Sequence, residues 1–184
     1  MKRKINETEN DCDFETENVY SEKNKIYFYC TVNRTNILKL NTEIQKICAF
    51  EYDSIIVYIN SEGGDLYAGL SGHNHIKHSR IPVTTIIDGQ CASAATFLSI
   101  AGKKRKMFEM SEVLIHQFRS YIDGKFHDMK DDIENYSHLM EQIKKMYIQN
   151  TKISNSKLNC LLTKEKVLFA SDCLKYGIID EIIN

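Results

Sequence analysis

The sequence predicts an α/β fold built on a parallel sheet. Two apolar runs of strand length, 54–59 and 83–88, are separated by a segment with the pattern of a helix. A continuous apolar run is typical of a strand covered on both faces, as strands of parallel sheets are. Glycine-containing turns, SEGGD and DGQCAS, follow both runs. Since ligands of such sheets bind beyond the carboxyl ends of the strands, these turns are the first candidates for a site.

The other elements follow from residue type and spacing. Aromatic and β-branched residues predict a strand at 25–32. Apolar residues at three- and four-residue spacing predict an amphipathic helix at 36–50. Further along the chain we expect a helix at about 66–77, a break at Pro82, a small-residue helix at ASAATFLSIAG, and short strands at about 105–109 and 112–116.

Segment 126–150 is expected to form one long helix. Its apolar residues alternate at spacings of four and three, and the opposite face is charged: Met129, Ile133, Tyr136, Met140, Ile143 and Tyr147. So narrow a stripe could pack on the core or against the same helix of another subunit. The end of the chain, SDCLKYGIIDEII, predicts a short helix, a C-cap at Gly177 and a final strand.

Length and charge predict one domain, at 21–184, preceded by a tail at 1–20. Residues 1–18 carry three basic and six acidic side chains, and so polar a segment buries little apolar surface. The tail is therefore expected to be disordered or removable. The formal net charge of the whole chain is −1, which indicates neither nucleic acid nor a membrane surface as partner. No apolar run reaches the roughly 18 residues of a membrane span.

Cysteine and histidine usage argues against disulfides and metals. The six cysteines are scattered, none forms a CxxC pair, and no secretory pattern precedes them, which favours a reducing compartment such as the cytoplasm. His73, His75 and His78 share an expected helix with no cysteine or carboxylate placed beside them, so no metal site is expected. The basic run KKRK at 103–106 is expected to be a solvated face.

Ser93, within GQCASAA, follows a strand and a glycine-containing turn and begins the next expected helix. A helix N-terminus offers free N–H groups and a partial positive charge, which suit a developing oxyanion. Ala94 and the neighbouring alanines leave room for an acyl group. On this motif alone, Ser93 could also be a helix N-cap in a close-packed turn.

Two further features of the sequence could act together with Ser93 in catalysis. Gly63 and Gly64, in INSEGGD, could aim a backbone N–H into a pocket or only turn the chain. His116, in VLIHQF, closes an apolar strand, where it could be a structural histidine. A serine hydroxyl needs a base within about 3 Å, because it is a poor nucleophile at neutral pH. His116 can supply that base if its strand lies beside the strand that precedes Ser93.

The three features occur in one order: the glycine pair, the small-residue serine turn, and then IHQ. In order and spacing the chain resembles the proteolytic subunit of the Clp protease, ClpP. The resemblance runs from about Ile55 to Ile183 and rests on YINSEGGDLYAG, IPVTTIIDGQCASAATFLSIAGKKRKM, EVLIHQF and ASDCLKYGIIDEI. Before Ser54 the match is one of pattern alone.

The resemblance implies a role for each matched residue. Ser93 would be the nucleophile of a serine endopeptidase and His116 its general base. The backbone N–H groups of Gly64 and Ala94 would form the oxyanion hole.

Two positions depart from the family pattern. The third triad member, an aspartate in the family, falls on Glu165 in TKEKVLF, whose extra methylene changes the reach. Asp172 is the nearest alternative carboxylate, and a site without an acid partner is the remaining option. Glu62 stands where the family usually has proline before the two glycines, which puts a charge near the expected substrate groove.

The resemblance also implies an architecture and partners. The fold would be the crotonase-like spiral of ββα units, with the long helix protruding as a handle between two stacked, typically heptameric, rings of identical subunits. The substrate would be unfolded or flexible polypeptide, delivered by an ATP-driven unfoldase. The chain contains no G-x-x-x-x-G-K-[ST] motif, so we expect no nucleotide or other cofactor of its own.

Three alternatives remain open from the sequence. A viral or phage head-maturation protease shares this fold and these motifs and differs in its partner, a scaffold or capsid protein. A hydratase or isomerase acting on acyl-CoA would use the same fold without a serine nucleophile. A non-catalytic subunit of a mixed ring is the third alternative: the presence of both Ser93 and His116 argues against it, while Glu62 and Glu165 leave it open.

Overall fold

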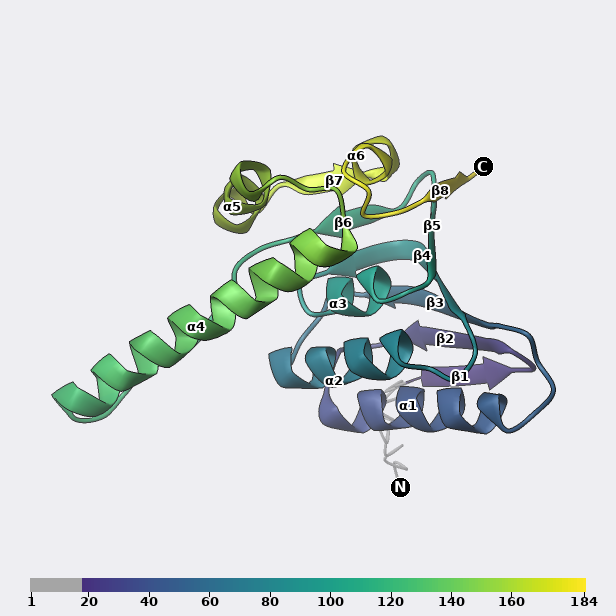
Figure 1. Cartoon of the computed structure of the whole chain (residues 1–184), viewed down its shortest axis with the longest axis horizontal. Coiled ribbons are helices and arrows are strands. Elements are labelled where there is room, and N and C mark those ends of the chain that lie inside the picture. The colour runs from purple at the N-terminus through teal and green to yellow at the C-terminus, as the bar shows by residue number, and fades with distance from the viewer. Residues whose placement is uncertain (1–17) are drawn as a thin grey trace, which may run out of the picture.

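An eight-stranded sheet forms the centre of the structure, a computed structural model that describes residues 18–184 (Figure 1). Strands pair in the order β1-β2-β3-β4-β5-β8, while β6 pairs with β4 and β7 beside this path. The strands are β1 (Asn18–Glu22), β2 (Lys25–Tyr29), β3 (Ile55–Ser61), β4 (Val83–Ala92), β5 (Lys104–Phe108), β6 (Glu112–Leu114), β7 (Val167–Phe169) and β8 (Glu181–Ile183). The pairs β1–β2 and β6–β7 are antiparallel and the others are parallel, so the expected parallel α/β sheet is present.

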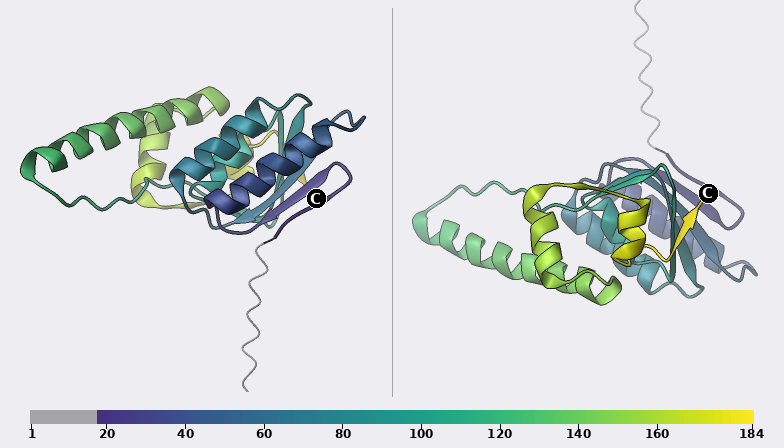
Figure 2. Two further views of the ribbon diagram at one scale, coloured as in Figure 1. Left: turned by 90° about the horizontal axis from the view of Figure 1, so that it is seen from below. Right: turned by 90° about the horizontal axis from the view of Figure 1, so that it is seen from above.

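Six helices surround this sheet within the described residues. Helices α1, α2 and α3 lie together on one face, α5 and α6 lie at the end of the chain beside β7, and α4 projects away from the body (Figures 1 and 2). Their bounds are α1 (Arg34–Cys48), α2 (Leu66–Lys77), α3 (Ala95–Ile100), α4 (Phe126–Asn150), α5 (Asn155–Lys164) and α6 (Ala170–Lys175).

The core forms where the apolar strands meet the helices. Ile55, Val57 and Ile59 of β3 are each 0% exposed and lie on one face of the sheet. Ile56 and Tyr58, on the other face, are only half-buried, so β3 is not covered equally on both faces as its apolar run predicted. Buried residues of α1 and α2 cover the fully buried face. The sequence patterns therefore predicted where these strands and helices lie, but not that only one face of β3 is fully buried.

Strand β4 continues four residues beyond the expected end at Asp88. The pairing of β3 with β4 shifts register between Ile59 and Ser61, and Gly89 has φ +127°. The side chain of Asn60 accepts a hydrogen bond from the Gln90 N–H at 3.0 Å, which carries the chain across this irregularity. The GQ dipeptide was interpreted as a turn, but it is a bulge that lets β4 continue to pair with β6.

Three elements were not expected from the sequence: β1, α5 and β7. Strand β1 begins at Asn18, so residues 18–20, assigned to the tail, belong to the folded domain. The rest of that expected tail, residues 1–17, lies outside the described residues. Helix α5 begins at Asn155 after its N-cap, Ser154, whose side chain accepts a hydrogen bond from the Lys157 N–H, and β7 is only three residues long. Elements this short carry little periodicity.

Helix α4 spans the predicted 126–150 but divides into two parts. Ile143 and Tyr147 are 4% and 2% exposed and pack into the core, whereas Ile133 is 57% exposed on the projecting part. The ring of Tyr147 contacts Phe97 edge to face, and its hydroxyl hydrogen-bonds to Thr96, so α4 is anchored on α3. The core interpretation of its apolar stripe therefore holds for the C-terminal part of the helix.

In the described part of the chain, no helix combines the length and hydropathy needed to cross a membrane.

Candidate active site

Ser93 occupies the sharp turn between β4 and α3. Its φ is +54°, in the left-handed region that non-glycine residues rarely adopt. The backbone N–H of Ser93 donates to the carbonyl of Leu114 at 2.9 Å, which extends the β4–β6 ladder by one residue. Helix α3 begins two residues later, at Ala95, with Ala94 as its N-cap, so Ser93 precedes the helix and does not begin it as expected. A strained backbone at such a turn is characteristic of functional positions.

The glycine pair packs directly against this turn. A Cβ on Gly63 would lie 2.7 Å from the Cβ of Ser93 and 2.6 Å from the Ala92 carbonyl oxygen, closer than real Cβ atoms approach. A Cβ on Gly64 would lie 2.3 Å from the Val32 carbonyl oxygen. Both glycines also have positive φ, +98° and +145°. Both glycines therefore do more than turn the chain: Gly63 allows the close approach to Ser93, and Gly64 allows the close approach to Val32.

Two backbone N–H groups remain free at this junction. Neither Gly64 nor Ala94 donates its N–H to any acceptor within residues 18–184. Two nearby groups are engaged: Val32 N–H donates to Gly63 O, and Asp65 N–H donates to Val32 O, each at 2.7 Å. Unpaired backbone donors beside a candidate nucleophile are the arrangement that stabilises a developing oxyanion.

Strand pairing brings His116 to the same place. Strands β4 and β6 are parallel with Ala92 opposite Leu114, so the residues following each strand emerge at the same edge of the sheet. The side chain of His116 is 17% exposed, and its Nδ1 is buried without a hydrogen-bond partner in the described part of the chain. Ser93 and His116 line one cavity without a direct hydrogen bond between them among these residues. The imidazole is thus available to both a serine and an acid.

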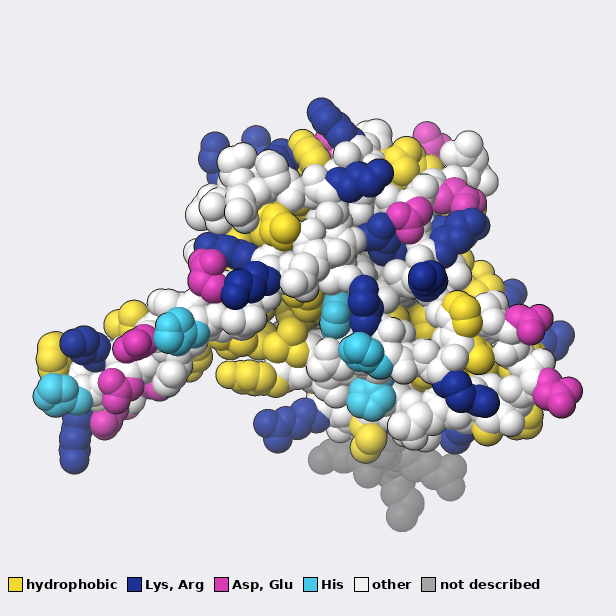
Figure 3. Space-filling view, viewed as in Figure 1, with side chains coloured by type: hydrophobic (Ala, Val, Ile, Leu, Met, Phe, Trp, Pro, Cys, Tyr) yellow, Lys and Arg dark blue, Asp and Glu magenta, His cyan; other side chains and the backbone are white. Residues whose placement is uncertain are grey.

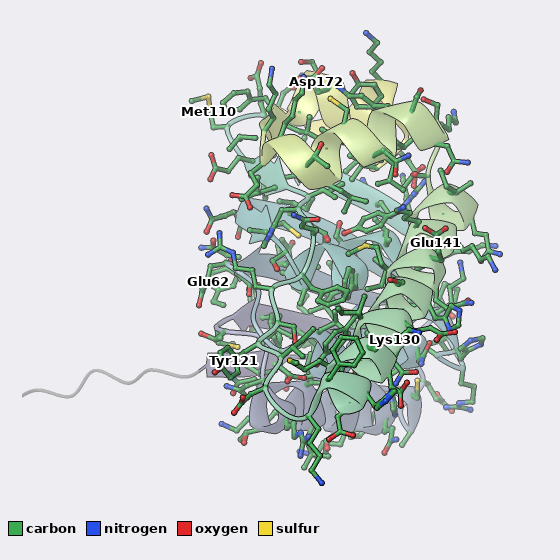
Figure 4. The ribbon with its side chains drawn as sticks, turned by 90° about the vertical axis from the view of Figure 1, so that its left-hand side faces the viewer. Glu62, Met110, Tyr121, Lys130, Glu141 and Asp172 are labelled. Atoms are coloured by element: carbon green, nitrogen blue, oxygen red, sulfur yellow. The ribbon has the colours of Figure 1, made fainter. Side chains whose placement is uncertain are left out.

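Glu165 reaches His116 through the pairing of β6 with β7. These strands are antiparallel with Leu114 opposite Val167, so position 165 comes opposite position 116 when the register is continued. Oε1 of Glu165 lies 3.9 Å from Nδ1 of His116 and 3.6 Å from Nη2 of Arg119. Asp172, the alternative carboxylate, lies on α6, at the top of the view in Figure 4.

The cavity between these elements has a volume of about 620 Å³. Its polar lining comes from the turns around Ser93 and the glycine pair and from the segment after β6: Glu62, Asp65, Ser93, His116, Arg119 and Ser120. Its apolar lining comes largely from α3 and α4: Leu66, Phe97, Phe118, Leu139, Met140 and Ile143. A cavity that has a few polar residues on one side and an apolar wall on the other is suited to holding a peptide segment beside a nucleophile.

Two thiols near the site, those of Cys91 and Cys173, are too buried to act as nucleophiles in place of Ser93. Cys91, two residues before Ser93, is 0% exposed, and burial raises its pKa far above the ordinary range. Burial likewise raises the pKa of Cys173 to about 12. Both thiols stay protonated at neutral pH, and only a thiolate is an effective nucleophile.

Two histidines outside this cavity are hydrogen-bonded to backbone carbonyls. Nδ1 of His73 is hydrogen-bonded to the Phe97 carbonyl, and that of His75 to the Ser71 carbonyl. Burial lowers the pKa of His73, which keeps it neutral. Across residues 18–184, no three His, Cys, Asp or Glu side chains are grouped to hold a metal ion.

Sequence reasoning did not assign three contributors to this site. Arg119 contacts Glu165 and lines the cavity, yet a single arginine in a loop carries no motif. Tyr136 and Met140 of α4 also line the cavity. Both residues belong to the apolar stripe that predicted the long helix, but the stripe alone does not indicate which cavity it faces.

The fold belongs to the class of the ClpP proteolytic subunits. A structure of a ClpP1 mutant from Listeria monocytogenes superposes with a TM-score of 0.80, covering 88% of this chain and 92% of that chain at 22% identity. The family model described as Clp protease matches residues 16–184. The chain therefore belongs to the Clp protease family, and the fold expected from the resemblance, with its protruding helix, is confirmed.

A curated relative gives the same family. The "ATP-dependent Clp protease proteolytic subunit" of Deinococcus radiodurans is 30% identical over 132 residues, 71% of this chain. The aligned stretch spans 65% of the length of that relative.

Proposed function

We propose that this chain is a serine endopeptidase, with Ser93 as nucleophile and His116 as general base. The observation that carries the proposal is a single cavity lined by Ser93 and His116, beside two backbone N–H groups that have no acceptor. An activated serine needs a base within reach and a donor pair for the oxyanion. Membership of the Clp protease family supports the same reaction.

The proposed chemistry is acyl transfer to water. His116 removes the proton from the Ser93 hydroxyl as its oxygen attacks a peptide carbonyl, and the N–H groups of Gly64 and Ala94 hold the resulting oxyanion. His116 then gives that proton to the leaving amine, which leaves an acyl-enzyme. Water attacks the ester in the same way and regenerates Ser93.

Glu165 is proposed as the residue that orients His116. Its carboxylate lies 3.9 Å from the buried Nδ1 of that ring, which has no other partner among residues 18–184. A carboxylate in this position favours the tautomer with hydrogen on Nδ1 and leaves Nε2 to accept the serine proton. A tightening of this contact is needed for a full hydrogen bond, and such contacts often tighten only when substrate binds.

The proposed assembly is a homo-oligomer, two stacked heptameric rings, that degrades unfolded or flexible polypeptide in the cytoplasm. Exposed apolar residues on the projecting part of α4 support association between copies. The name of the Deinococcus radiodurans relative includes ATP dependence, whereas this sequence contains no phosphate-binding motif. An unfoldase partner is therefore proposed to supply the energy.

The test is covalent labelling of the full chain with a fluorophosphonate probe, read by intact mass. We expect one adduct on the wild type and none on Ser93→Ala or His116→Ala. Ser137→Ala and His127→Ala, both on the exposed part of α4, are matched controls that should label like the wild type. No adduct on wild type, in a sample whose oligomers are verified by mass photometry, would contradict the peptidase proposal and favour a non-catalytic subunit.

A further inference from the structure

Glu62 lies at the rim of the candidate active site, one residue before the glycine that touches Ser93. Its side chain is exposed to solvent and lines the cavity. In Figure 4 it is labelled on the side of the view opposite α4, whose residues form the apolar wall. A peptide held between the oxyanion donors and that apolar wall would therefore pass the Glu62 carboxylate.

The position of this carboxylate is fixed by two sets of hydrogen bonds. The Thr31 hydroxyl donates to Oε1 of Glu62 at 2.6 Å, while Oε2 accepts no hydrogen bond from residues 18–184. The backbone around it is tied to Val32, because Val32 N–H donates to Gly63 O and Asp65 N–H donates to Val32 O. A side chain already held in one place loses less conformational entropy when it forms an ion pair.

The other charges of the cavity leave Glu62 unopposed. Asp65 is also acidic, and its Oδ1 accepts the Ala68 N–H at the start of α2. Arg119 is the basic residue of the lining, but it is 82% exposed and lies 3.6 Å from Glu165. The Glu62 rim is therefore negative, while the α4 wall is apolar. A ligand complementary to both surfaces carries a cation next to an apolar group.

We propose that Glu62 is a specificity determinant that selects peptides with a lysine or arginine adjacent to an apolar residue at the cleaved bond. The apolar residue would occupy the cavity beside Leu139 and Met140, and the basic side chain would pair with Oε2 of Glu62. This inference rests on the proposed peptidase function. A pair at a partly exposed rim changes selectivity modestly, by about fivefold between a basic and a neutral side chain.

The experiment uses peptidyl phosphonate probes, which bond to an activated serine without requiring turnover. Three probes share one apolar residue at the phosphonate and carry lysine, norleucine or glutamate at the adjacent position. The second-order labelling rate of the full chain is measured by intact mass, beside a plain fluorophosphonate that carries no peptide. We expect the lysine probe to label about fivefold faster than norleucine, and the glutamate probe to be slowest.

Two variants separate Glu62 from the general charge of the chain. Glu62→Gln keeps an oxygen that can accept the Thr31 hydrogen bond but removes the charge, so the ratio of lysine to norleucine rates should fall to about one. Glu51→Gln changes an exposed residue that does not line the cavity and should keep the wild-type ratio. Raising the salt concentration should also lower the wild-type ratio.

Each failure has a different meaning. Equal rates for the lysine and norleucine probes, or a preference for lysine that persists in Glu62→Gln, would overturn the role of Glu62 and leave the peptidase intact. A chain that reacts with neither the peptidyl probes nor the plain fluorophosphonate would overturn the proposed function itself, and this inference with it.

Discussion

Backbone strain is concentrated at the candidate triad. Within residues 18–184, three non-glycine residues have positive φ: Lys23, Ser93 and Glu165. The last two are proposed members of the triad. A left-handed residue with a side chain costs about 1–2 kcal/mol, so the surrounding structure must hold it in place. Here that structure is the ladder bond from Ser93 to Leu114 and the C-cap of α5 at Glu165.

The contact between Glu165 and His116 leads to a prediction about labelling rate. Glu165→Gln should lower the second-order rate of fluorophosphonate labelling by about ten- to a hundredfold, because an amide does not stabilise the imidazolium as a carboxylate does. Asp172→Asn is the matched control, since it changes the alternative carboxylate, and it should label like the wild type. A loss in Asp172→Asn with none in Glu165→Gln would show that the assignment of the third residue is wrong.

At the scale of elements, Arg105 links three parts of the chain that are distant in sequence. Its Nη2 and Nε bond to the two carboxylate oxygens of Asp180 at 2.5 and 3.1 Å. Its Nη1 donates to the carbonyls of Gly177 and Asn150, the latter at the end of α4. One side chain thus joins β5, the C-terminal end of α4 and the turn before β8. The basic run KKRK, expected to be a solvated face, contains this half-buried residue.

Removing this link should destabilise the fold. Arg105→Met should lower the free energy of unfolding in urea by about 2 kcal/mol, because two carbonyls and a carboxylate lose their donor. Lys104→Met, which breaks an exposed pair with Glu181, is the control and should leave the free energy of unfolding close to that of the wild type.

The dependence of the free energy of unfolding on pH, at acid pH, should also change in Arg105→Met. Burial of Asp180 opposes its ionisation, but hydrogen bonds from Arg105 outweigh this and hold the pKa of Asp180 below its usual range. Its ionised form therefore stabilises the fold above the unfolded pKa, near 4, and this contribution is lost as pH falls through the lower folded pKa. Arg105→Met should lose less stability than the wild type below about pH 4. An equal loss of stability below about pH 4 in the wild type and in Arg105→Met would contradict this role of Arg105.

At the scale of the whole molecule, the projecting helix α4 carries apolar side chains that a single copy of the chain leaves exposed. Apolar side chains gather where α4 meets the body and reappear at its outer end (Figure 3). Phe126 and Ile133 are 73% and 57% exposed, which is unusual for a continuous stripe on an isolated domain. Because the C-terminal part of the same helix forms the apolar wall of the cavity, association along α4 would couple assembly to the site.

This geometry leads to a prediction about assembly. Ile133→Lys should dissociate the proposed oligomer at concentrations about tenfold or more above those at which the wild type dissociates, because a charge replaces an apolar contact. Asn135→Lys adds the same charge on the opposite face of α4 and should assemble like the wild type. Mass photometry over a dilution series measures both. Identical dissociation of the two variants would show that the apolar stripe is not an interface.

Much of this molecule could be predicted because its signals are local. Apolar runs marked β3 and the first part of β4, whose alternate or neighbouring residues are buried in the core, and the helical period of α4 extends over 25 residues. The expected end of β4 was wrong, since a bulge and a turn use the same glycine chemistry and only strand pairing distinguishes them. Helix α5 and strand β7 escaped prediction because ten and three residues carry too few repeats of a period.

The sequence by itself determined which groups are chemically available: Ser93 before a helix, a glycine pair after a strand, and His116 at the end of another. These depend on residue type and on a few neighbours, so they can be read from the chain. Tertiary structure alone decided that Glu165, 49 positions after His116, comes within 3.9 Å of it, and that Arg119 shares the same carboxylate. The reason is physical: the register of β6 with β7 is set by packing and long-range hydrogen bonds, which leave no local pattern in the sequence.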